Sequence, residues 1–280
     1  MHTGEVAVGG VRSPLIQAGP ADAAEAVVFV HGNPGSRLDW EGLVRRVGEF
    51  GRALAFDMPG FGQADKPRDF AYRVEGYAAF IAGALEQLGV QRVHLVIHDF
   101  GGPFGICWAA RHPDALASAV AFNTSAMINR RWHRMAKLWR RPVVGELVMA
   151  ATNRRAWRRA FSRSRRPLPD AFVDRMYDDF DRGTRRAVLR LYRATNLPYP
   201  SASSWVEVLR GLDRPALIVW GANDPFIGRG RVEHLREAFP SAEVVMLEES
   251  GHWPFIDDPE RACEPAVRFL RTRIASGARA

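Results

Sequence analysis

The chain has 280 residues, 47% of them hydrophobic and 25% charged, which fits one large α/β domain or a core with an inserted subdomain. Its two cysteines, Cys107 and Cys263, show neither a CxxC spacing nor a Cys/His cluster, which argues against a disulfide framework and a metal site. No apolar leader and no uncharged run of about 18 residues occurs. We therefore expect a soluble, cytoplasmic protein with no membrane span and no metal.

The net charge of +8 is unevenly distributed. Residues 126–210 contain 20 Arg and Lys against 7 Asp and Glu, a balance of +13, and the rest of the chain carries −5. No nucleic-acid-binding motif accompanies this basic segment, so nucleic acid is not an expected partner. Its helical spacing, as in RRAWRRAF (154–161), favours solvated helix faces. Attraction to anionic substrates, lipids or a partner is the alternative.

Short apolar or β-branched runs alternate with longer helical stretches along the chain. The expected strands are, in order, 26–32, 52–57, 92–99, 117–123, 215–221 and 242–252. The expected helices include 74–89, 101–111, 230–239 and 259–274. This alternation predicts an α/β fold with a doubly wound, mostly parallel sheet, whose functional loops follow the carboxyl ends of the strands.

One interval interrupts this alternation. From Ser125 to Gly211 the sequence shows helical patterns, tryptophans and prolines but no strand pattern, and the interval is too long for a loop. It leaves after one strand and returns before the next, which predicts a helical cap over the carboxyl edge of the sheet. The expected organisation is a core over 1–124, a cap over 125–211 and the rest of the core over 212–280.

Several chemically distinctive motifs fall at the ends of predicted strands. They are HGNPG (31–35), DMPGFG (57–62), HDFGG (98–102), GANDP (221–225) and GHW (251–253). In the third motif, Asp99 stands where a strand turns sharply into a helix, and Gly101 and Gly102 supply the small residues that such a turn needs. Asp99, Asp224 and His252 follow one another in the order nucleophile, acid, histidine.

This layout resembles the α/β-hydrolase superfamily, and within it the aspartate-nucleophile branch that contains epoxide hydrolases and haloalkane dehalogenases. The resemblance spans roughly residues 20–275 and is strong over the core and weak over the cap. Ile97, two residues before the apex, is β-branched as in dehalogenase-like members, and ESGHWPFIDDPE closely matches the family's histidine segment. The resemblance implies an α/β-hydrolase fold with an inserted helical cap.

The resemblance also implies a two-step hydrolysis. The carboxylate of Asp99, ionised near neutral pH, attacks an sp³ carbon that bears a leaving group and forms an alkyl ester. His252 then activates water, while Asp224 orients the imidazole and stabilises its charge. The backbone N–H groups of Phe100 and Asn33 bind the oxyanion of the second step. A small apolar electrophile and water are the expected partners, with no cofactor.

The acid of this layout has a second possible position. A subset of dehalogenases places it after the strand that corresponds to 117–123, where this chain has Asn123 and no nearby carboxylate. Asp224, 28 residues before His252, is therefore the expected acid.

Two leaving groups are compatible with this nucleophile. An epoxide needs an acid for its opening oxygen, and AVLRLYRATN (187–196) resembles the cap segment that carries a ring-opening tyrosine, here Tyr192. The usual partner tyrosine is absent near Val143, and Tyr177 is the possible substitute. A halide needs N–H donors, and the amide of Asn33 qualifies as one of them.

The second halide donor is missing from its usual position. Dehalogenases normally have Trp after the nucleophile, whereas this chain has Phe100, which cannot donate. A cap tryptophan is the alternative donor, and the candidates are Trp132, Trp139, Trp157 and Trp205. Fluoroacetate dehalogenases, which share the YRA pattern, have a carboxylate-binding Arg where Phe100 stands.

These helper residues favour an epoxide hydrolase, with a haloalkane dehalogenase as the alternative. A non-catalytic, ligand-binding homologue is a distant third hypothesis, and the absence of a G-x-S-x-G serine argues against an esterase. An apolar substrate pocket is expected around Trp139, Tyr177 and Phe100. The sequence leaves open the substrate's size and stereochemistry, the oligomeric state and the role of the basic cap.

Overall fold

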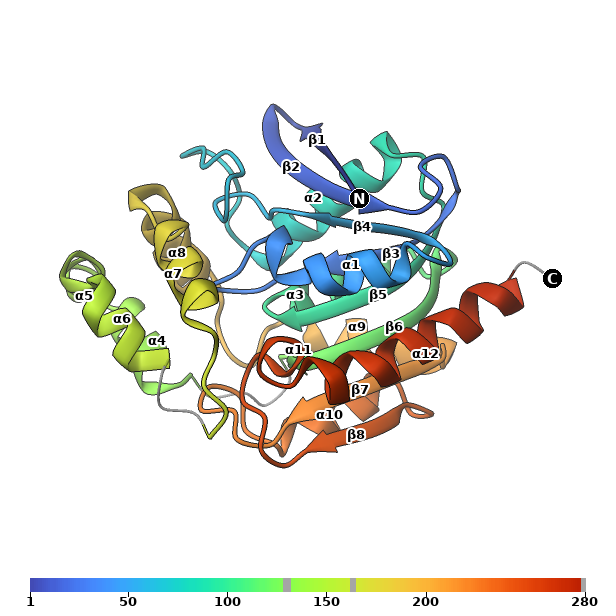
Figure 1. The fold of residues 1–280 in the computed structure, drawn as a ribbon. Helices are drawn as coiled ribbons and strands as arrows, with labels where there is room; N and C mark the ends of the chain where they lie inside the picture. The colour runs from blue at the N-terminus through green and yellow to red at the C-terminus, as the bar shows by residue number, and fades with distance from the viewer. Residues whose placement is uncertain (128–131, 162–164, 278–280) are drawn as a thin grey trace.

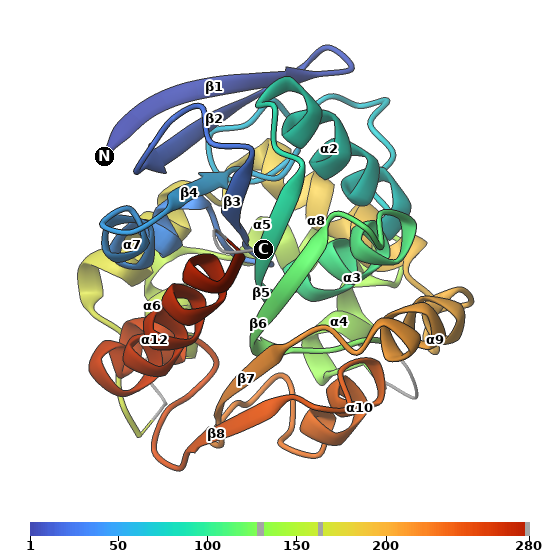
Figure 2. The same ribbon diagram turned by 90° about the vertical axis from the view of Figure 1, so that its right-hand side faces the viewer.

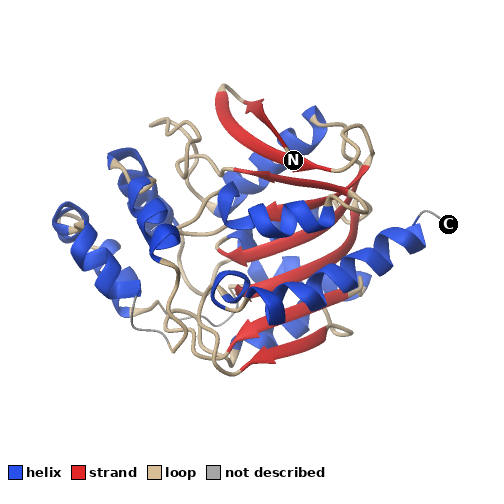
Figure 3. Ribbon diagram, in the orientation of Figure 1, coloured by secondary structure: helices blue, strands red, loops and turns tan. Residues whose placement is uncertain are grey.

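The computed structural model describes residues 1–127, 132–161 and 165–277. Within them, strands form one sheet in the order β1-β2-β4-β3-β5-β6-β7-β8 (Figure 3). Their bounds are β1 His2–Val8, β2 Val11–Ala18, β3 Glu25–Val30, β4 Arg52–Phe56, β5 Arg92–Asp99, β6 Leu116–Thr124, β7 Ala216–Gly221 and β8 Glu243–Leu247. The pairs β1–β2 and β2–β4 are antiparallel and the others are parallel, which confirms the predicted mostly parallel sheet.

The central strands are apolar without alternation because both faces of the sheet are covered. In β5 every residue after Arg92 is buried, as expected for a parallel strand between two helical layers. The hairpin of β1 and β2 was not predicted. Most of β1 is exposed, and its first four residues include His2, Thr3 and Glu5, so its sequence lacks the apolar signal of the inner strands. The last predicted strand is too long, since β8 ends at Leu247 and the following segment forms a loop that carries His252.

Helices cover both faces of the sheet (Figures 1 and 2). One layer contains α1 (Glu41–Val47) and α12 (Pro259–Gly277), which contact each other. The other layer contains α2 (Val74–Gln87), α3 (Gly101–Arg111), α9 (Ala202–Leu212) and α10 (Arg231–Ala238). Two short elements, the 3₁₀ turn η1 (Arg37–Trp40) and α11 (Pro254–Asp257), lie near the strand ends.

Of the helices that the described residues form between β6 and β7, all but the last lie beside the carboxyl edge of the parallel strands (Figure 1). They are α4 (Arg134–Trp139), α5 (Val144–Ala151), α6 (Arg154–Phe161), α7 (Asp170–Asp178) and α8 (Arg182–Ala194). We call these five helices the cap. The expected cap range of 125–211 also includes most of α9, but α9 packs against α3 and α10 in the layer that covers the sheet.

The amphipathic pattern of α8 explains how the cap presents Tyr192. Asp181 caps the helix by accepting a hydrogen bond from the backbone N–H of Thr184 at 2.8 Å. Thr184, Ala187, Leu191 and other residues at helical spacing are buried, and Tyr192 lies on the same side. The arginines occupy the opposite side, so burial of the apolar stripe turns Tyr192 inward.

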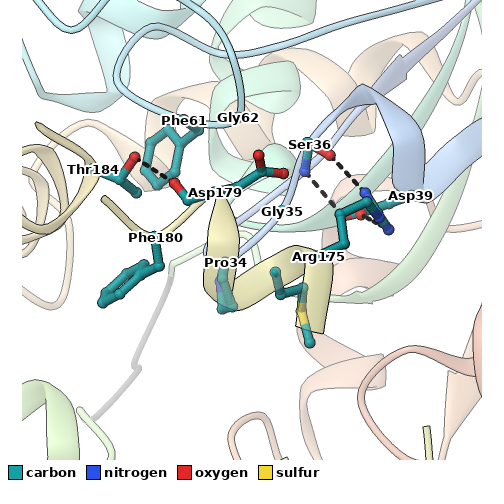
Figure 4. Close-up of a pocket in the computed structure, with 11 residues that line it drawn as sticks. Pro34, Gly35, Ser36, Asp39, Phe61, Gly62, Arg175, Asp179, Phe180 and Thr184 are labelled. Carbon is teal, nitrogen blue, oxygen red and sulfur yellow. Dashed lines mark hydrogen bonds and ion pairs between the residues drawn. The ribbon is translucent and has the colours of Figure 1, made fainter. Parts of the chain in front are cut away.

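Polar contacts attach the cap to the loop after β3 (Figure 4). Arg175 of α7 donates to Ser36 Oγ at 2.8 Å and to Asp39 Oδ1 at 2.9 Å. Burial raises the pKa of Asp39, although the charge of Arg175 acts in the opposite direction. The space left among these residues is about 10 Å³, no more than one water molecule needs. The cap and core are therefore closely packed on this side.

Candidate active site

Asp99 lies at the apex of a sharp turn between β5 and α3. Its φ of 48° is in the left-handed region, which is uncommon for a residue with a side chain. A Cβ on Gly101 would lie 2.1 Å from the carbonyl oxygen of Val30, and one on Gly102 would lie 1.8 Å from Thr124 Oγ1. The turn therefore accepts only glycine at these two positions, in agreement with the sequence-based argument.

The loop after β3 holds one oxygen of the Asp99 carboxylate. The backbone N–H of Asn33 donates to Asp99 Oδ1 at 2.8 Å. This approach requires Gly32, because a Cβ there would lie 2.5 Å from the same oxygen. His31 braces the loop, since its Nε2 accepts from the backbone N–H of Met58 at 2.8 Å and its Nδ1 donates to the carbonyl of Gly32 at 2.9 Å.

His252 is placed between two carboxylates. Its Nδ1 lies 2.6 Å from Asp224 Oδ2, and its Nε2 lies 3.5 Å from Asp99 Oδ2. Burial alone would lower the pKa of His252, but the charges and hydrogen bonds of Asp224 and Asp99 raise it to about 9. The two carboxylates therefore favour the protonated, cationic form of His252 at neutral pH.

The second histidine of this region has the opposite electrostatics. His98 packs against His252 with ring centroids 4.6 Å apart, and its Nε2 lies 2.8 Å from the backbone carbonyl oxygen of His252. Burial, reinforced by the positive charge of His252, lowers the pKa of His98 to about 3. A neutral His98 donates this hydrogen bond and holds the His252 backbone beside the turn.

Asp99 and His252 open onto a cavity of about 220 Å³ between the cap and the core. Most of the other lining side chains are apolar or aromatic, which fits the expected apolar pocket. They include Met135, Trp139, Val148, Ala156, Trp157, Ala160, Phe161, Phe180, Phe226 and Trp253.

Tyr192 brings a hydroxyl group into this cavity. Asn33 Nδ2 donates to the Tyr192 hydroxyl oxygen at 3.3 Å, which places the phenol beside the loop that holds Asp99. The Tyr192 ring is fixed by the rings of Phe100, Trp132 and Trp139, with centroids 5.0 to 5.1 Å away. The cap thus contributes a phenol hydroxyl to the cavity, and the core contributes the carboxylate and the histidine.

The model of the alpha/beta hydrolase fold family matches residues 25–259. The chain belongs to the α/β-hydrolase fold family. It is 27% identical over 286 residues to the cis-3-alkyl-4-alkyloxetan-2-one decarboxylase of Xanthomonas campestris pv. campestris, across 94% of this chain and 93% of that protein.

Two solved structures are similar to this α/β-hydrolase along nearly their whole length. Haloalkane dehalogenase DbeA from Bradyrhizobium elkani has a TM-score of 0.84 at 23% identity, covering 98% of this chain and 99% of that one. An epoxide hydrolase variant from Bacillus megaterium has a TM-score of 0.78 at 21% identity, covering 95% and 99%. These likenesses confirm the α/β-hydrolase fold, and the protein is an α/β-fold hydrolase.

Some residues that the sequence suggested for the pocket of this hydrolase lie elsewhere. Phe100 is fully buried behind Tyr192 and is not among the described residues that line the cavity. Tyr177 also lies outside this lining, where Trp157 and the guanidinium of Arg154 contact its ring. Trp205 packs on Tyr199, away from Asp99.

Asn123 is a residue whose importance the sequence did not reveal. It occupies the alternative acid position, and its Nδ2 donates to Asp224 Oδ2 at 2.8 Å and to the carbonyl oxygen of Gly221 at 3.0 Å. Its Oδ1 accepts from the backbone N–H of Gly221 at 2.8 Å. Asn123 therefore links the ends of β6 and β7 and orients the carboxylate that contacts His252. The sequence feature that could have pointed to Asn123 is a polar amide side chain at the end of an otherwise apolar strand.

Asp224 receives two further hydrogen bonds from the loop that follows it. The backbone N–H groups of Phe226 and Ile227 donate to its Oδ1 at 2.7 and 2.9 Å. Its side chain is fully buried and hydrogen-bonded at both oxygens. Phe226 and Trp253 line the cavity beside His252. Neither residue was predicted from the sequence as part of the substrate pocket.

The described residues form neither a cluster of metal ligands nor a membrane-spanning helix. Residues 1–127, 132–161 and 165–277 contain no group of three or more His, Cys, Asp and Glu side chains placed to hold a metal ion. In the same ranges no helix combines the length and apolar character that crossing a bilayer requires.

Proposed function

We propose that this α/β-fold hydrolase opens and hydrolyses epoxides through an alkyl ester of Asp99. The observation that carries the proposal is the Tyr192 hydroxyl, which lines the same cavity as Asp99 and His252 and contacts Asn33. An opening epoxide develops negative charge on oxygen and needs such an acid. The buried pair of His252 and Asp224 supplies the base for the second step.

In the first step, an oxygen of the Asp99 carboxylate attacks a ring carbon and the carbon–oxygen bond of the epoxide breaks. The electron pair of that bond goes to the epoxide oxygen, which takes the proton of the Tyr192 hydroxyl. The carboxylate becomes a neutral ester, so His252 loses one of the two charges that raise its pKa. His252 then releases its proton, which restores the phenol of Tyr192.

In the second step, neutral His252 takes a proton from a water molecule that attacks the ester carbonyl of Asp99. The backbone N–H of Asn33, which donates to Asp99 Oδ1 in the free enzyme, stabilises the oxyanion. Breakdown of the tetrahedral intermediate releases a diol and returns the Asp99 carboxylate beside a protonated His252. The proton balance closes because the histidine is a cation at both ends of the cycle.

Two other electrophiles fit parts of this site. A haloalkane would use Asn33 Nδ2 as a halide donor, although that group already donates to Tyr192. An oxetan-2-one is named in the activity of the Xanthomonas relative, which matches this chain almost end to end. Such a ring also presents an sp³ carbon with an oxygen leaving group. We rank the epoxide first because its opening needs a proton donor and Tyr192 can serve as that donor.

The variant His252→Gln tests the proposal, because it forms the Asp99 ester but does not hydrolyse it. We expect the intact mass to rise by one whole epoxide after exposure to a panel of small epoxides, with peptide mapping to Asp99. A gain of an alkyl group without halogen, from haloalkanes alone, would identify a dehalogenase instead. Absence of an adduct from epoxides, haloalkanes and oxetan-2-ones would contradict an alkylated aspartate and favour the non-catalytic hypothesis.

Tyr192→Phe tests the acid separately. Loss of general acid catalysis lowers the rate of ring opening by about 10² to 10⁴. Tyr199→Phe is a matched control, since Tyr199 is also buried but bonds to Glu75 outside the cavity. Equal rates of ring opening for the two variants would show that Tyr192 is not the proton donor.

A further inference from the structure

The cap exposes apolar side chains on its outer part. Of the large hydrophobic residues exposed in the described ranges, Met135, Val143, Val144 and Leu147 all belong to α4, α5 or the turn between them. Val143 and Leu147 are 69% and 65% exposed, more than any other large hydrophobic side chain described. Figure 1 shows α5 at the side of the cap that is turned away from the sheet. Such clustering marks an interaction surface.

Helix α5 is apolar on its exposed side as well as its buried side. Gly145 and Met149 are buried, whereas Val144, Leu147 and Ala151 follow one another at i, i+3 and i+7 and are exposed. A helix that only needed to pack on the cap would carry polar residues at these exposed positions.

Basic residues flank these apolar side chains along the chain. The segment 134–161 contains eight Arg and Lys residues and a single acid, Glu146. That acid is already paired with Arg193, at 2.7 Å. The exposed cations nearest in sequence to the apolar side chains are Arg134, Lys137 and Arg141. An apolar strip bordered by cations is complementary to a surface that is apolar inside and anionic outside.

The apolar face continues into the catalytic cavity. Met135 is exposed and also lines the cavity, and Val148, one residue after Leu147, lines it from α5. Ala156 and Ala160 of α6 are likewise exposed residues that line it. The lining of the cavity that holds Asp99 therefore includes apolar side chains that are also exposed on the cap.

We propose that the outer cap face, defined by Met135, Val143, Val144, Leu147 and the cations beside them, docks on an anionic lipid surface from which apolar substrate enters the cavity. A second copy of this chain is a poorer occupant, because two such faces would bring like charges together. Docking of this kind is peripheral, and it does not depend on which electrophile Asp99 attacks.

Sedimentation with lipid vesicles tests the proposal on the full chain. We expect binding to vesicles of phosphatidylcholine with phosphatidylglycerol, weak binding to phosphatidylcholine alone, and release by high salt. Lys137→Gln/Arg141→Gln should weaken the binding about 30-fold, which corresponds to about fivefold for each cation lost near the surface. No binding to the anionic vesicles at low salt would overturn the proposal.

A second variant tests the apolar contribution. Val143→Asn/Leu147→Ser should weaken vesicle binding by about tenfold, because it replaces the two most exposed large apolar side chains of this face with polar ones. Val208→Ser/Val244→Ser is the matched control, because these residues are 40% and 38% exposed on the core, outside the cap. Equal binding by the two double variants would overturn the assignment of this face.

The test also separates lipid from protein partners. Concentration-dependent self-association in sedimentation velocity that Val143→Asn/Leu147→Ser abolishes, with no vesicle binding, would make a second copy the occupant and overturn the proposal. Turnover of a water-soluble epoxide in the absence of vesicles should be unchanged by the Lys137→Gln/Arg141→Gln substitutions. A lack of turnover in the wild type would contradict the proposed function without affecting the docking result.

Discussion

At the scale of single residues, Asp99 acts together with Asp224 to hold the proton on His252. The two side chains are 3.5 Å apart, and Asp99 is one of the two carboxylates that raise the pKa of the imidazole to about 9. In the proposed reaction the same carboxylate is neutralised by esterification. The nucleophile therefore switches the histidine from a cation to a base as the ester forms.

Asp99→Asn reproduces the neutral state of the ester and should lower the pKa of His252. An opposite charge within about 4–6 Å shifts a pKa by about 1 to 3 units, so we expect a fall of at least about 1 unit. NMR titration of the His252 imidazole measures this directly. Asp224→Asn should also lower the pKa, and an unchanged value in Asp99→Asn would show that Asp224 alone holds the proton.

At the scale of elements, α7 connects the cap to the loop that positions Asn33. The side chain of Arg175 extends from α7 and pairs with Asp39, whose side chain is 1% exposed. The backbone N–H of Ser36 donates to the same carboxylate at 3.1 Å. The ion pair therefore lies between a cap helix and the segment that follows the HGNP motif. Its loss affects both the stability of the fold and the geometry of the cavity.

Arg175→Gln should lower the free energy of unfolding by about 3 kcal/mol, because it leaves the buried carboxylate of Asp39 without its cation. Urea denaturation measures the change. Arg45→Gln, which removes an exposed i,i+4 pair with Glu41, is the control and should cost less than about 0.5 kcal/mol. Adding Asp39→Asn should recover part of the loss. A double variant no more stable than Arg175→Gln would indicate that the pair matters through packing and not through charge.

At the scale of the whole molecule, the buried histidines shape the pH dependence of stability. The pKa of His252 is raised from 6.5 to about 9 in the folded state. The proton on His252 therefore stabilises the fold fully below about pH 6.5, and this contribution is lost as pH rises through about 9. Burial raises the pKa of Asp257 from 3.8 to about 6, so its ionisation lowers stability as pH rises through about 6, which is a lower window than that of His252.

The stability difference between the wild type and His252→Gln should therefore shrink between pH 6.5 and 9.5, by an amount on the order of 3 kcal/mol. Urea denaturation at both pH values measures it. His98→Gln is the matched control, because the pKa of the neighbouring His98 is lowered to about 3 and its charge does not change above pH 6.5. A pH-independent difference for His252→Gln would mean that His252 is neutral in the folded enzyme.

The opposite charges of cap and core also belong to this scale. The helical spacing of the basic segment 126–210 predicts solvated helix faces, whereas in the fold many of its arginines have structural partners. Arg175 anchors the cap, and Arg185 donates to backbone carbonyl groups of Phe180 and Met149. Only the fold distinguishes these paired cations from the exposed cations around α4 and α5, because the sequence shows which residues are charged but not which groups they contact.

The sequence by itself determined the sheet, the order of its central strands along the chain, the elbow at Asp99 and the succession of Asp99, Asp224 and His252. These signals are local, since apolar runs, glycine turns and strand ends are each read within about ten residues. It did not predict the β1–β2 hairpin, whose exposed edge strand lacks an apolar pattern.

Only the tertiary structure decided which cap aromatics share a cavity with Asp99. Tyr192 lines the cavity and Tyr177 does not, although both occupy helical stretches with similar patterns. Only the tertiary structure also brings Asn123 at the end of β6 into hydrogen-bonding contact with Asp224, which is 101 residues away in the chain. Helical spacing predicts which side of a helix is buried. It does not predict which residues that side contacts, because those contacts depend on how elements distant in the sequence pack together.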